Sequence, residues 1–173
     1  MPTNAGETRP DARPPDRRGS ESPMTLHLQN PARSRGLPPA AKLRRWASEA
    51  IPGRAEVTVR VVSASEGRRL NREFRGKDYA TNVLSFAYGK APGDGALTGD
   101  LVLCAPVVRT EARAQRKALE AHYAHLLVHG LLHLRGYDHE DESGAQRMER
   151  LERRILARLG FSDPYRLPGD ERP

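Results

Sequence analysis

The chain has 173 residues, a length suited to one domain with a sizeable hydrophobic core. Its formal net charge of +7 favours an anionic partner such as nucleic acid, and its single cysteine, Cys104, excludes an internal disulfide bond. No apolar run reaches the length of a membrane span, and the polar N-terminus lacks the apolar segment of a secretory signal. These features favour a protein of the reducing cytoplasm.

Four short segments predict a small sheet. Apolar and polar side chains alternate over 25–29 and 57–61, and residues 82–87 and 100–104 are interpreted as two further strands. A glycine-rich turn is expected between the last two segments, over residues 89–99. Residues 1–23 are polar and rich in proline, so we expect them to form a disordered N-terminal extension.

Helical spacing of apolar residues predicts helices around this sheet. The first covers about 43–51, and the second is capped by Ser65 and turns Leu70 and Phe74 inward. A long central helix is expected over 107–134, and a last helix from near Ser143 to Gly160. The prediction is an α+β fold, with a small mixed sheet of about four strands packed with helices. We expect one domain over 24–160 and a flexible tail over 161–173.

Three histidines at the end of the long helix carry the strongest chemical signal. His129 and His133 are four residues apart, so they lie on one face of a helix. Gly136 follows where the helix must end, because glycine easily adopts the left-handed conformation of a helix terminus. The chain can then return and bring His139 to the same point. Three neutral imidazoles with one open position are the ligands of a catalytic zinc ion, so we predict one zinc ion per chain.

The same spacing occurs in the zinc-protease pattern H-E-x-x-H-x-x-G-x-x-H, with one difference. Gly130 stands where a protease has the glutamate that acts as its general base. The sequence therefore indicates a zinc hydrolase with a metalloprotease-like fold whose substrate is not a peptide. The alternative, three unrelated histidines at a helix end, is weakened because three of the six histidines fall within residues 129–139.

A second polar segment precedes the third predicted strand. Its cations are Arg68, Arg69, Arg72, Arg75 and Lys77. Arginine forks match phosphate oxygens, so Arg72, Arg75 and Lys77 are candidate contacts for a phosphate-containing substrate. The alternative is a basic helix face in water, which is the commoner meaning of such a run of charges.

Taken together, residues 71–86 and 129–139 resemble the YbeY family of ribosomal RNA maturation factors. The histidine segment matches the family pattern H-G-x-L-H-L-x-G-Y-D-H, and the other segment matches N-x-x-[YF]-R-x-K-D-x-x-T-[DN]-V-L-S-F. Gly99-Asp100 followed by apolar residues is similar to a further family segment, and the likeness extends over about residues 24–159. One departure is Ala80, where family members often have proline.

The resemblance implies a single-strand-specific, metal-dependent endoribonuclease of the bacterial cytoplasm. It implies roles in ribosomal RNA processing, including maturation of the small-subunit 3′ end, and in ribosome quality control. By the same resemblance His129, His133 and His139 are catalytic zinc ligands, and Arg75 is a catalytic and substrate-binding residue. The implied partners are ribosomal RNA, the small ribosomal subunit, one of its proteins and an assembly GTPase, with no membrane.

Neighbouring residues leave parts of the mechanism open. We assign proton transfer, as a hypothesis, to His125 or Asp138, either of which can instead orient a metal ligand through a hydrogen bond. Attack by water and attack by the RNA 2′-hydroxyl are both compatible with these residues. His122 is expected at the surface, and Glu152 is expected to form ion pairs with arginines of the last helix.

Two other functions are compatible with the pattern. One is a ribosome-assembly factor in which zinc stabilises the fold without catalysis. The other is a metalloprotease, against which Gly130 argues because it leaves no general base beside the first histidine.

Overall fold

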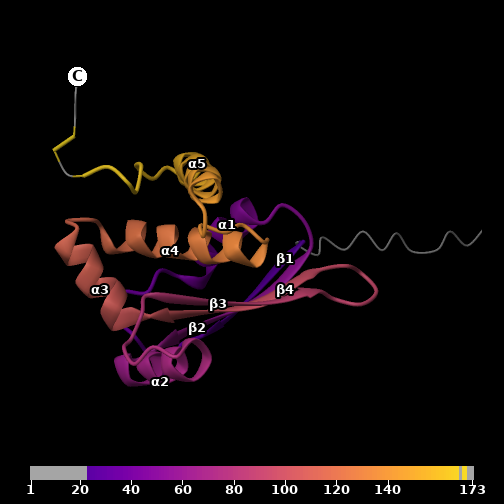
Figure 1. Cartoon of the computed structure of the whole chain (residues 1–173), viewed down its shortest axis with the longest axis horizontal. Coiled ribbons are helices and arrows are strands. Elements are labelled where there is room, and N and C mark those ends of the chain that lie inside the picture. Colours follow the sequence, from indigo (N-terminus) through magenta and orange to yellow (C-terminus); the bar gives the residue numbers. More distant parts are fainter. Residues whose placement is uncertain (1–22, 168, 171–173) are drawn as a thin grey trace, which may run out of the picture.

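The computed structural model describes residues 23–167 and 169–170 (Figure 1). The extension predicted for residues 1–23 lies outside the described residues, except for Pro23. The described elements follow in the order β1 Met24–Gln29, α1 Ala40–Ala50, β2 Ala55–Val62, α2 Ala64–Arg75, β3 Val83–Lys90, β4 Leu97–Cys104, α3 Ala105–Ala114, α4 Leu119–Leu134 and α5 Glu142–Arg158.

The strands form one mixed sheet in the order β1-β2-β4-β3. The pairs β1/β2 and β2/β4 are parallel, whereas β3 and β4 are antiparallel and leave β3 at the edge. The predicted α+β class and four-stranded mixed sheet are therefore confirmed. The turn is shorter than predicted, because Lys90 already pairs with Leu97 and Gly89 belongs to β3.

Helices cover both faces of the sheet (Figure 1). Helices α1 and α4 lie on one face and α2 on the other, and α5 packs on the side of α4 away from the sheet. The larger core is formed by the first face, where Val57 and Leu101 meet Leu127 and Leu131, all fully buried. Burying each such side chain contributes about 1.5–3 kcal/mol. No helix of the described chain combines the length and the apolar character needed to cross a membrane.

The predicted long helix over 107–134 is wrong, because the chain turns between α3 and α4. Arg116 has a φ of +52°, and the Lys117 backbone N–H donates to the Ala112 carbonyl at 2.9 Å, which ends α3. No glycine or proline marks this turn in the sequence. Helix α4 is accordingly a separate helix, and it carries the histidines.

Helix α2 also differs in detail from the prediction. Ser63, and not Ser65, caps the helix, because its side chain accepts a hydrogen bond from the Glu66 backbone N–H at 3.3 Å. Phe74 does not face inward: it is 52% exposed and meets the edge of the Phe86 ring, with ring centroids 5.3 Å apart. Helix α2 thus leaves its C-terminal end at the edge of the sheet, beside β3.

The segment after α5 packs against the domain where a flexible tail is expected. Phe161 meets Trp46 edge to face, with ring centroids 5.4 Å apart. Further along, the Asp163 carboxylate accepts a hydrogen bond from Arg153 at 3.2 Å, and the Tyr165 hydroxyl donates to Glu152. These contacts fix residues 161–165 against α5 and α1.

Candidate metal centre

Helix α4 carries a row of histidines along one edge. His125, His129 and His133 follow at intervals of four residues, so successive imidazoles lie one turn apart. The ring centroids are 6.2 Å apart for the first pair and 4.7 Å apart for the second. Most other positions of the helix are buried, so this partly exposed edge is the part of α4 that can reach a ligand.

The end of α4 brings a third imidazole to this row. Gly136 has a φ of +94°, and the Tyr137 backbone N–H donates to the Leu132 carbonyl at 3.1 Å, which closes the helix. The chain then turns back, and the His139 ring lies 5.0 Å from that of His133, measured between centroids. The glycine turn predicted from the sequence is therefore present.

The three imidazoles of His129, His133 and His139 fit a metal ion. Their ligand nitrogens all lie within 4.8 Å of one another, and the Nε2 atoms of His129 and His133 are 3.1 Å apart. Two nitrogens held about 2.0–2.1 Å from one tetrahedral ion are roughly 3.3 Å apart, so this spacing is that of co-ligands. Burial and the neighbouring imidazoles lower the pKa of His133, which favours the neutral form that binds a metal.

A buried carboxylate from α5 lies behind this group. Glu152 is fully buried, and its Oε1 accepts a hydrogen bond from Nδ1 of His129 at 2.5 Å. Its Oε2 accepts from Nε2 of His125 at 3.1 Å and from the Tyr165 hydroxyl. Burial opposes ionisation of Glu152, but these hydrogen bonds outweigh it and hold the pKa at about 2. Because Nδ1 of His129 donates its proton here, Nε2 carries the lone pair that can bind a metal.

Sequence reasoning missed this carboxylate and placed it at the surface. The available signal was position: Glu152 falls between Met148 and Ile155 at helical spacing, so it shares the buried face of α5. Asp138, which we predicted for such a role, instead accepts a hydrogen bond from the Glu140 backbone N–H at 3.0 Å. Within the described residues, no hydrogen bond joins Asp138 to a histidine, whereas His125 reaches the site through Glu152.

Arg75 lies in the same cavity as the three histidines. This cavity has a volume of about 500 Å³, and its other walls are formed by the start of β3 and the end of α4. The guanidinium group donates to the Ser85 carbonyl at 2.8 Å and lies 4.9 Å from the centre of the Phe86 ring. Helix α2 thus delivers Arg75 across the edge strand β3 to the side on which α4 carries its histidines.

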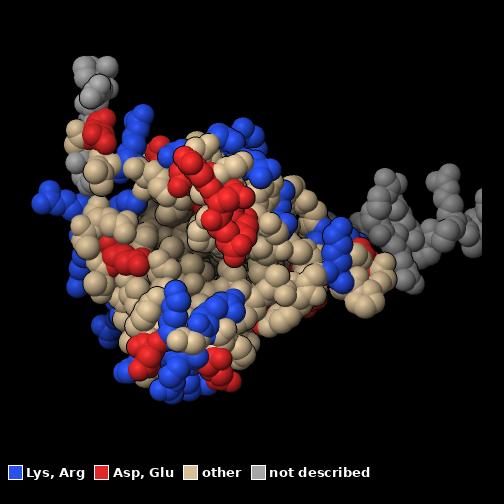
Figure 2. Space-filling view, viewed as in Figure 1, with Lys and Arg blue, Asp and Glu red and all other residues tan. Residues whose placement is uncertain are grey.

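The other predicted substrate contacts lie elsewhere. Arg68 donates two hydrogen bonds of 2.8 Å to Asp78, and Arg72 is 3.8 Å from the same carboxylate. Figure 2 shows lysine and arginine side chains mixed with acidic ones over α2. Neither Arg72 nor Lys77 lines the histidine cavity, so in the described chain Arg75 is its one arginine or lysine.

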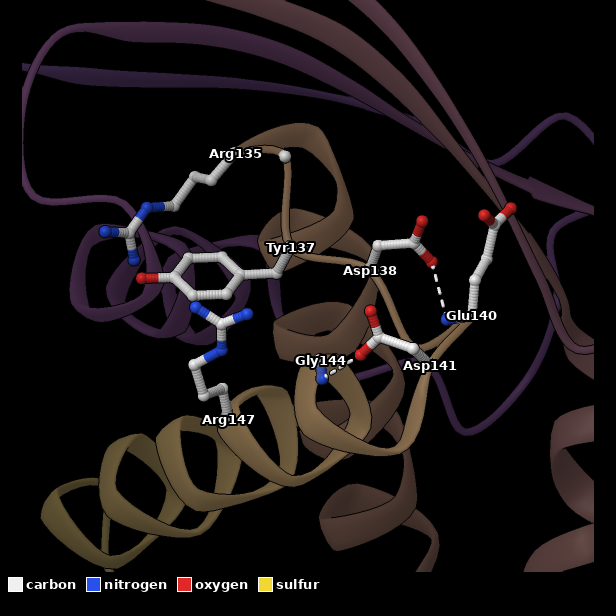
Figure 3. A pocket seen from close by; sticks show the side chains of 8 residues that line it. Arg135, Tyr137, Asp138, Glu140, Asp141, Gly144 and Arg147 are labelled. Atoms are coloured by element: carbon white, nitrogen blue, oxygen red, sulfur yellow. Dashed lines mark hydrogen bonds between the residues drawn. The ribbon is translucent and has the colours of Figure 1, made fainter.

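The loop that carries His139 is braced by the start of α5 (Figure 3). Asp141 caps that helix, accepting from the Gly144 backbone N–H at 2.5 Å. A Cβ atom at Gly144 would lie 2.6 Å from the Asp138 carbonyl, so helix and loop are in close contact. A second cavity of about 440 Å³, lined by Arg135, Tyr137 and others, opens on this loop and includes none of the three histidines.

His122 supports the wall of the histidine cavity that contains Asn82, through the carboxylate of Glu111. It is 3% exposed, which corrects the predicted surface position, and its Nε2 lies 2.7 Å from the Glu111 carboxylate. The same carboxylate accepts from the Asn82 side chain at 3.1 Å, and Asn82 lines the cavity. Burial lowers the pKa of His122, and the bond to Glu111 opposes this shift.

The structure explains why residue 130 is glycine. A Cβ atom there would lie 2.9 Å from Cδ2 of Leu101 and 3.3 Å from Oγ of Ser85. Glycine at this position offers no side chain to the cavity, and a larger residue would have to displace Leu101 from the contact between α4 and the sheet. The metalloprotease interpretation therefore lacks its general base in this structure as well as in the sequence.

A trio of histidines with an open coordination side, on an α+β scaffold and next to an arginine, is the arrangement of a metal-dependent hydrolase. The chain belongs to the family described as endoribonuclease YbeY, whose family model matches residues 40–160. The family predicted from the sequence is thereby confirmed, and with it an enzyme of the endoribonuclease class. The roles of the individual histidines and of Arg75 stay predictions.

Similar proteins bear the same name. The chain is 58% identical over 131 residues to endoribonuclease YbeY of Cupriavidus pinatubonensis, covering 76% of this chain and 65% of that protein. It is 55% identical over 147 residues to endoribonuclease YbeY of Paraburkholderia phymatum, covering 82% of this chain and 95% of that protein. The solution structure of TM1509 from Thermotoga maritima is 24% identical, with a TM-score of 0.48 over 83% of this chain and 99% of that one.

Proposed function

We propose that this protein is a zinc-dependent endoribonuclease that cuts single-stranded RNA during ribosomal RNA processing. The observation that carries the proposal is the single cavity lined by Arg75, His129, His133 and His139, in a chain of an endoribonuclease family. The proposed role is maturation of the small-subunit RNA 3′ end, together with ribosome quality control, in the cytoplasm. One zinc ion per chain is the proposed cofactor, because three imidazoles are a typical ligand set of catalytic zinc.

The residues of the cavity divide the work of phosphodiester cleavage. His129, His133 and His139 would hold the metal, which supplies Lewis-acid chemistry when bound. Arg75 donates hydrogen bonds to the scissile phosphate and balances the negative charge that grows on it. Its contacts with Ser85 and Phe86 hold the guanidinium group in place before substrate arrives. A cavity of about 500 Å³ suits one unpaired nucleotide unit, in agreement with a single-stranded substrate.

The proposed partners follow from the same substrate. Ribosomal RNA and the small ribosomal subunit are the expected targets, and the net charge of +7 favours binding to such a polyanion. A small-subunit ribosomal protein and an assembly GTPase are proposed as further partners, on the basis of the family resemblance.

A cleavage assay with a charge-matched control tests this function. The substrate is an end-labelled RNA that spans the 3′ end of small-subunit ribosomal RNA, incubated with zinc-loaded protein. Arg75→Ala removes the cation in the cavity, whereas Arg69→Ala removes one from the same helix, where it pairs with Glu73 at 3.6 Å. We expect cleavage by the wild type and by Arg69→Ala, and a loss of roughly 100-fold or more in Arg75→Ala.

The result also separates catalysis from a purely structural role. Zinc bound at one ion per chain without cleavage above the Arg75→Ala background, on free RNA and on small subunits alike, would support the non-catalytic assembly factor instead. Equal cleavage by Arg75→Ala and the wild type would remove Arg75 from the site. Absence of bound zinc from an active wild type would contradict the proposed cofactor.

A further inference from the structure

Glu152 makes further hydrogen bonds besides the one to His129. Its two oxygens are used differently: Oε1 faces Nδ1 of His129 at 2.5 Å, and Oε2 faces Nε2 of His125 and the Tyr165 hydroxyl. Because donors bind both oxygens, one on Oε1 and two on Oε2, they fix the rotation of the carboxylate. The first oxygen is thereby kept aimed at the imidazole.

Tyr165 itself is held in place from several sides. Its backbone N–H donates to Asp163 at 2.9 Å, and the same carboxylate accepts from Arg153 at 3.2 Å. The Arg153 guanidinium lies 4.9 Å from the centre of the Tyr165 ring, and the His125 ring meets it edge to face at 5.3 Å. In addition, Lys117 donates to the carbonyl of the intervening Pro164. Tyr165 is 39% exposed, yet its hydroxyl is directed at Glu152.

We propose that Glu152 and Tyr165 are positioning residues of the metal site, acting on the metal through His129. Glu152 keeps His129 in the tautomer with Nδ1 protonated, so that Nε2 points toward His133 and His139. A carboxylate partner of this kind also makes an imidazole a stronger ligand. The segment after α5 then belongs to the metal site, although none of its residues is a ligand. The inference rests on the proposed function, in which the three histidines bind zinc.

A merely structural role predicts a different result. Glu152 also joins α5 to α4, so its loss can lower the stability of the zinc-free protein whether or not it acts on the metal. Such a role leaves the zinc affinity of the folded protein unchanged. Affinity and ligand geometry, measured on folded protein, therefore separate positioning from stabilisation.

The experiment compares three variants of the full-length protein. Glu152→Gln replaces one acceptor oxygen by an NH₂ group that faces donors, and Tyr165→Phe removes only the hydroxyl. Tyr88→Phe is the matched control, because its hydroxyl also donates to a carboxylate, that of Asp100 at 2.8 Å, outside the histidine cavity. Zinc affinity is measured by competition with a chromogenic chelator, and ligand geometry by the visible absorption of the cobalt-substituted protein. Circular dichroism of the zinc-free form confirms folding.

The expected loss of zinc affinity is larger for Glu152, which contacts His129 directly, than for Tyr165, which acts through Glu152. We expect Glu152→Gln to bind zinc about 10–100-fold more weakly, and Tyr165→Phe to lose affinity in the same direction but less. Both should change the cobalt spectrum, whereas Tyr88→Phe should match the wild type. If Glu152→Gln does not fold, Tyr165→Phe decides the question alone.

Two negative results have separate meanings. A wild type that binds zinc tightly, with Tyr165→Phe and any folded Glu152→Gln equal to it in affinity and spectrum, overturns the inference and leaves the proposed function intact. A folded wild type that binds no zinc overturns the proposed zinc site, and the inference fails with it.

Discussion

The contact between β4 and the end of α4 allows a worked prediction for Gly99→Ala. A Cβ atom at Gly99 would lie 2.7 Å from Cδ2 of Leu134 and 2.9 Å from the backbone carbonyl oxygen of Phe86. The leucine methyl can move slightly, but the carbonyl belongs to the paired strand β3 and cannot move without disturbing the sheet. Leu134 directly follows His133 and lines the histidine cavity, so the strain falls at the metal site.

The magnitude combines two opposing effects. Overfilling such a contact costs about 1–3 kcal/mol. Replacing glycine by alanine also reduces the conformational entropy of the unfolded chain, which offsets about 0.4–1 kcal/mol of that cost. The net loss of unfolding free energy is then about 1.5 kcal/mol, or a decrease in Tm of roughly 3–6 °C for a domain of this size.

A double-mutant cycle measures how much of this cost arises at Leu134 and how much at the Phe86 carbonyl. Thermal and urea unfolding are measured for the wild type, Gly99→Ala, Leu134→Ala and the double variant. Leu134→Ala alone should cost about 2–5 kcal/mol, because Leu134 is 4% exposed. With this side chain removed, Gly99→Ala should cost at least about 0.5 kcal/mol less than in the wild type. An unchanged Tm for Gly99→Ala would refute the reasoning. An equal cost in both backgrounds would assign the strain to the Phe86 carbonyl and refute the claim that it falls at the metal site.

Three further predictions concern the metal loop, the basic helix and a buried histidine. Gly136→Ala should lower the unfolding free energy by about 1–2 kcal/mol and weaken zinc binding, because a side chain has space there but the φ of +94° is unfavourable for it. Gly136→Asn should show smaller losses in the same unfolding and zinc-binding assays. Arg72→Ala should leave kcat unchanged in the RNA cleavage assay, because Arg72 lies outside the cavity. The slope of log K for RNA binding against log salt concentration should decrease by at most about one, the value of a single phosphate contact. Burial holds the pKa of His122 below its ordinary value of 6.5, so the unfolding free energy should fall as the pH drops below 6.5. In urea unfolding of the zinc-free protein, His122→Asn should show a smaller fall over the same pH range.

The histidine trio could be predicted because its geometry is local. The interval between His129 and His133 places two imidazoles on one helix edge wherever that helix forms. Gly136 then specifies the turn, because few other residues adopt its backbone conformation cheaply. The first two strands could be predicted for a similar reason, since alternation of apolar side chains is also a local property.

Features that depend on tertiary contacts were not predicted. Glu152 is charged and lies among arginines of α5, so its sequence neighbours indicate a surface residue. Its actual partners, His129 and Tyr165, come from α4 and from the segment after α5. The break between α3 and α4 is similar, because Arg116 adopts a positive φ that nothing in its sequence context indicates. For Glu152, the contacts that decide its burial therefore come from segments distant in sequence.

The position of Gly130 connects the fold to the choice of substrate. Glycine at that position suits the close contact between α4 and the sheet, because the side chains of Leu101 and Ser85 would have to shift to admit a Cβ atom. The residue that follows His129 on α4 therefore supplies no carboxylate base. The charged side chain that does enter the cavity comes from the other face of the sheet: Arg75 of α2 passes the edge of β3. A cation in that position attracts an anionic group and would not activate water for attack on a peptide, so the geometry favours a phosphodiester as the substrate.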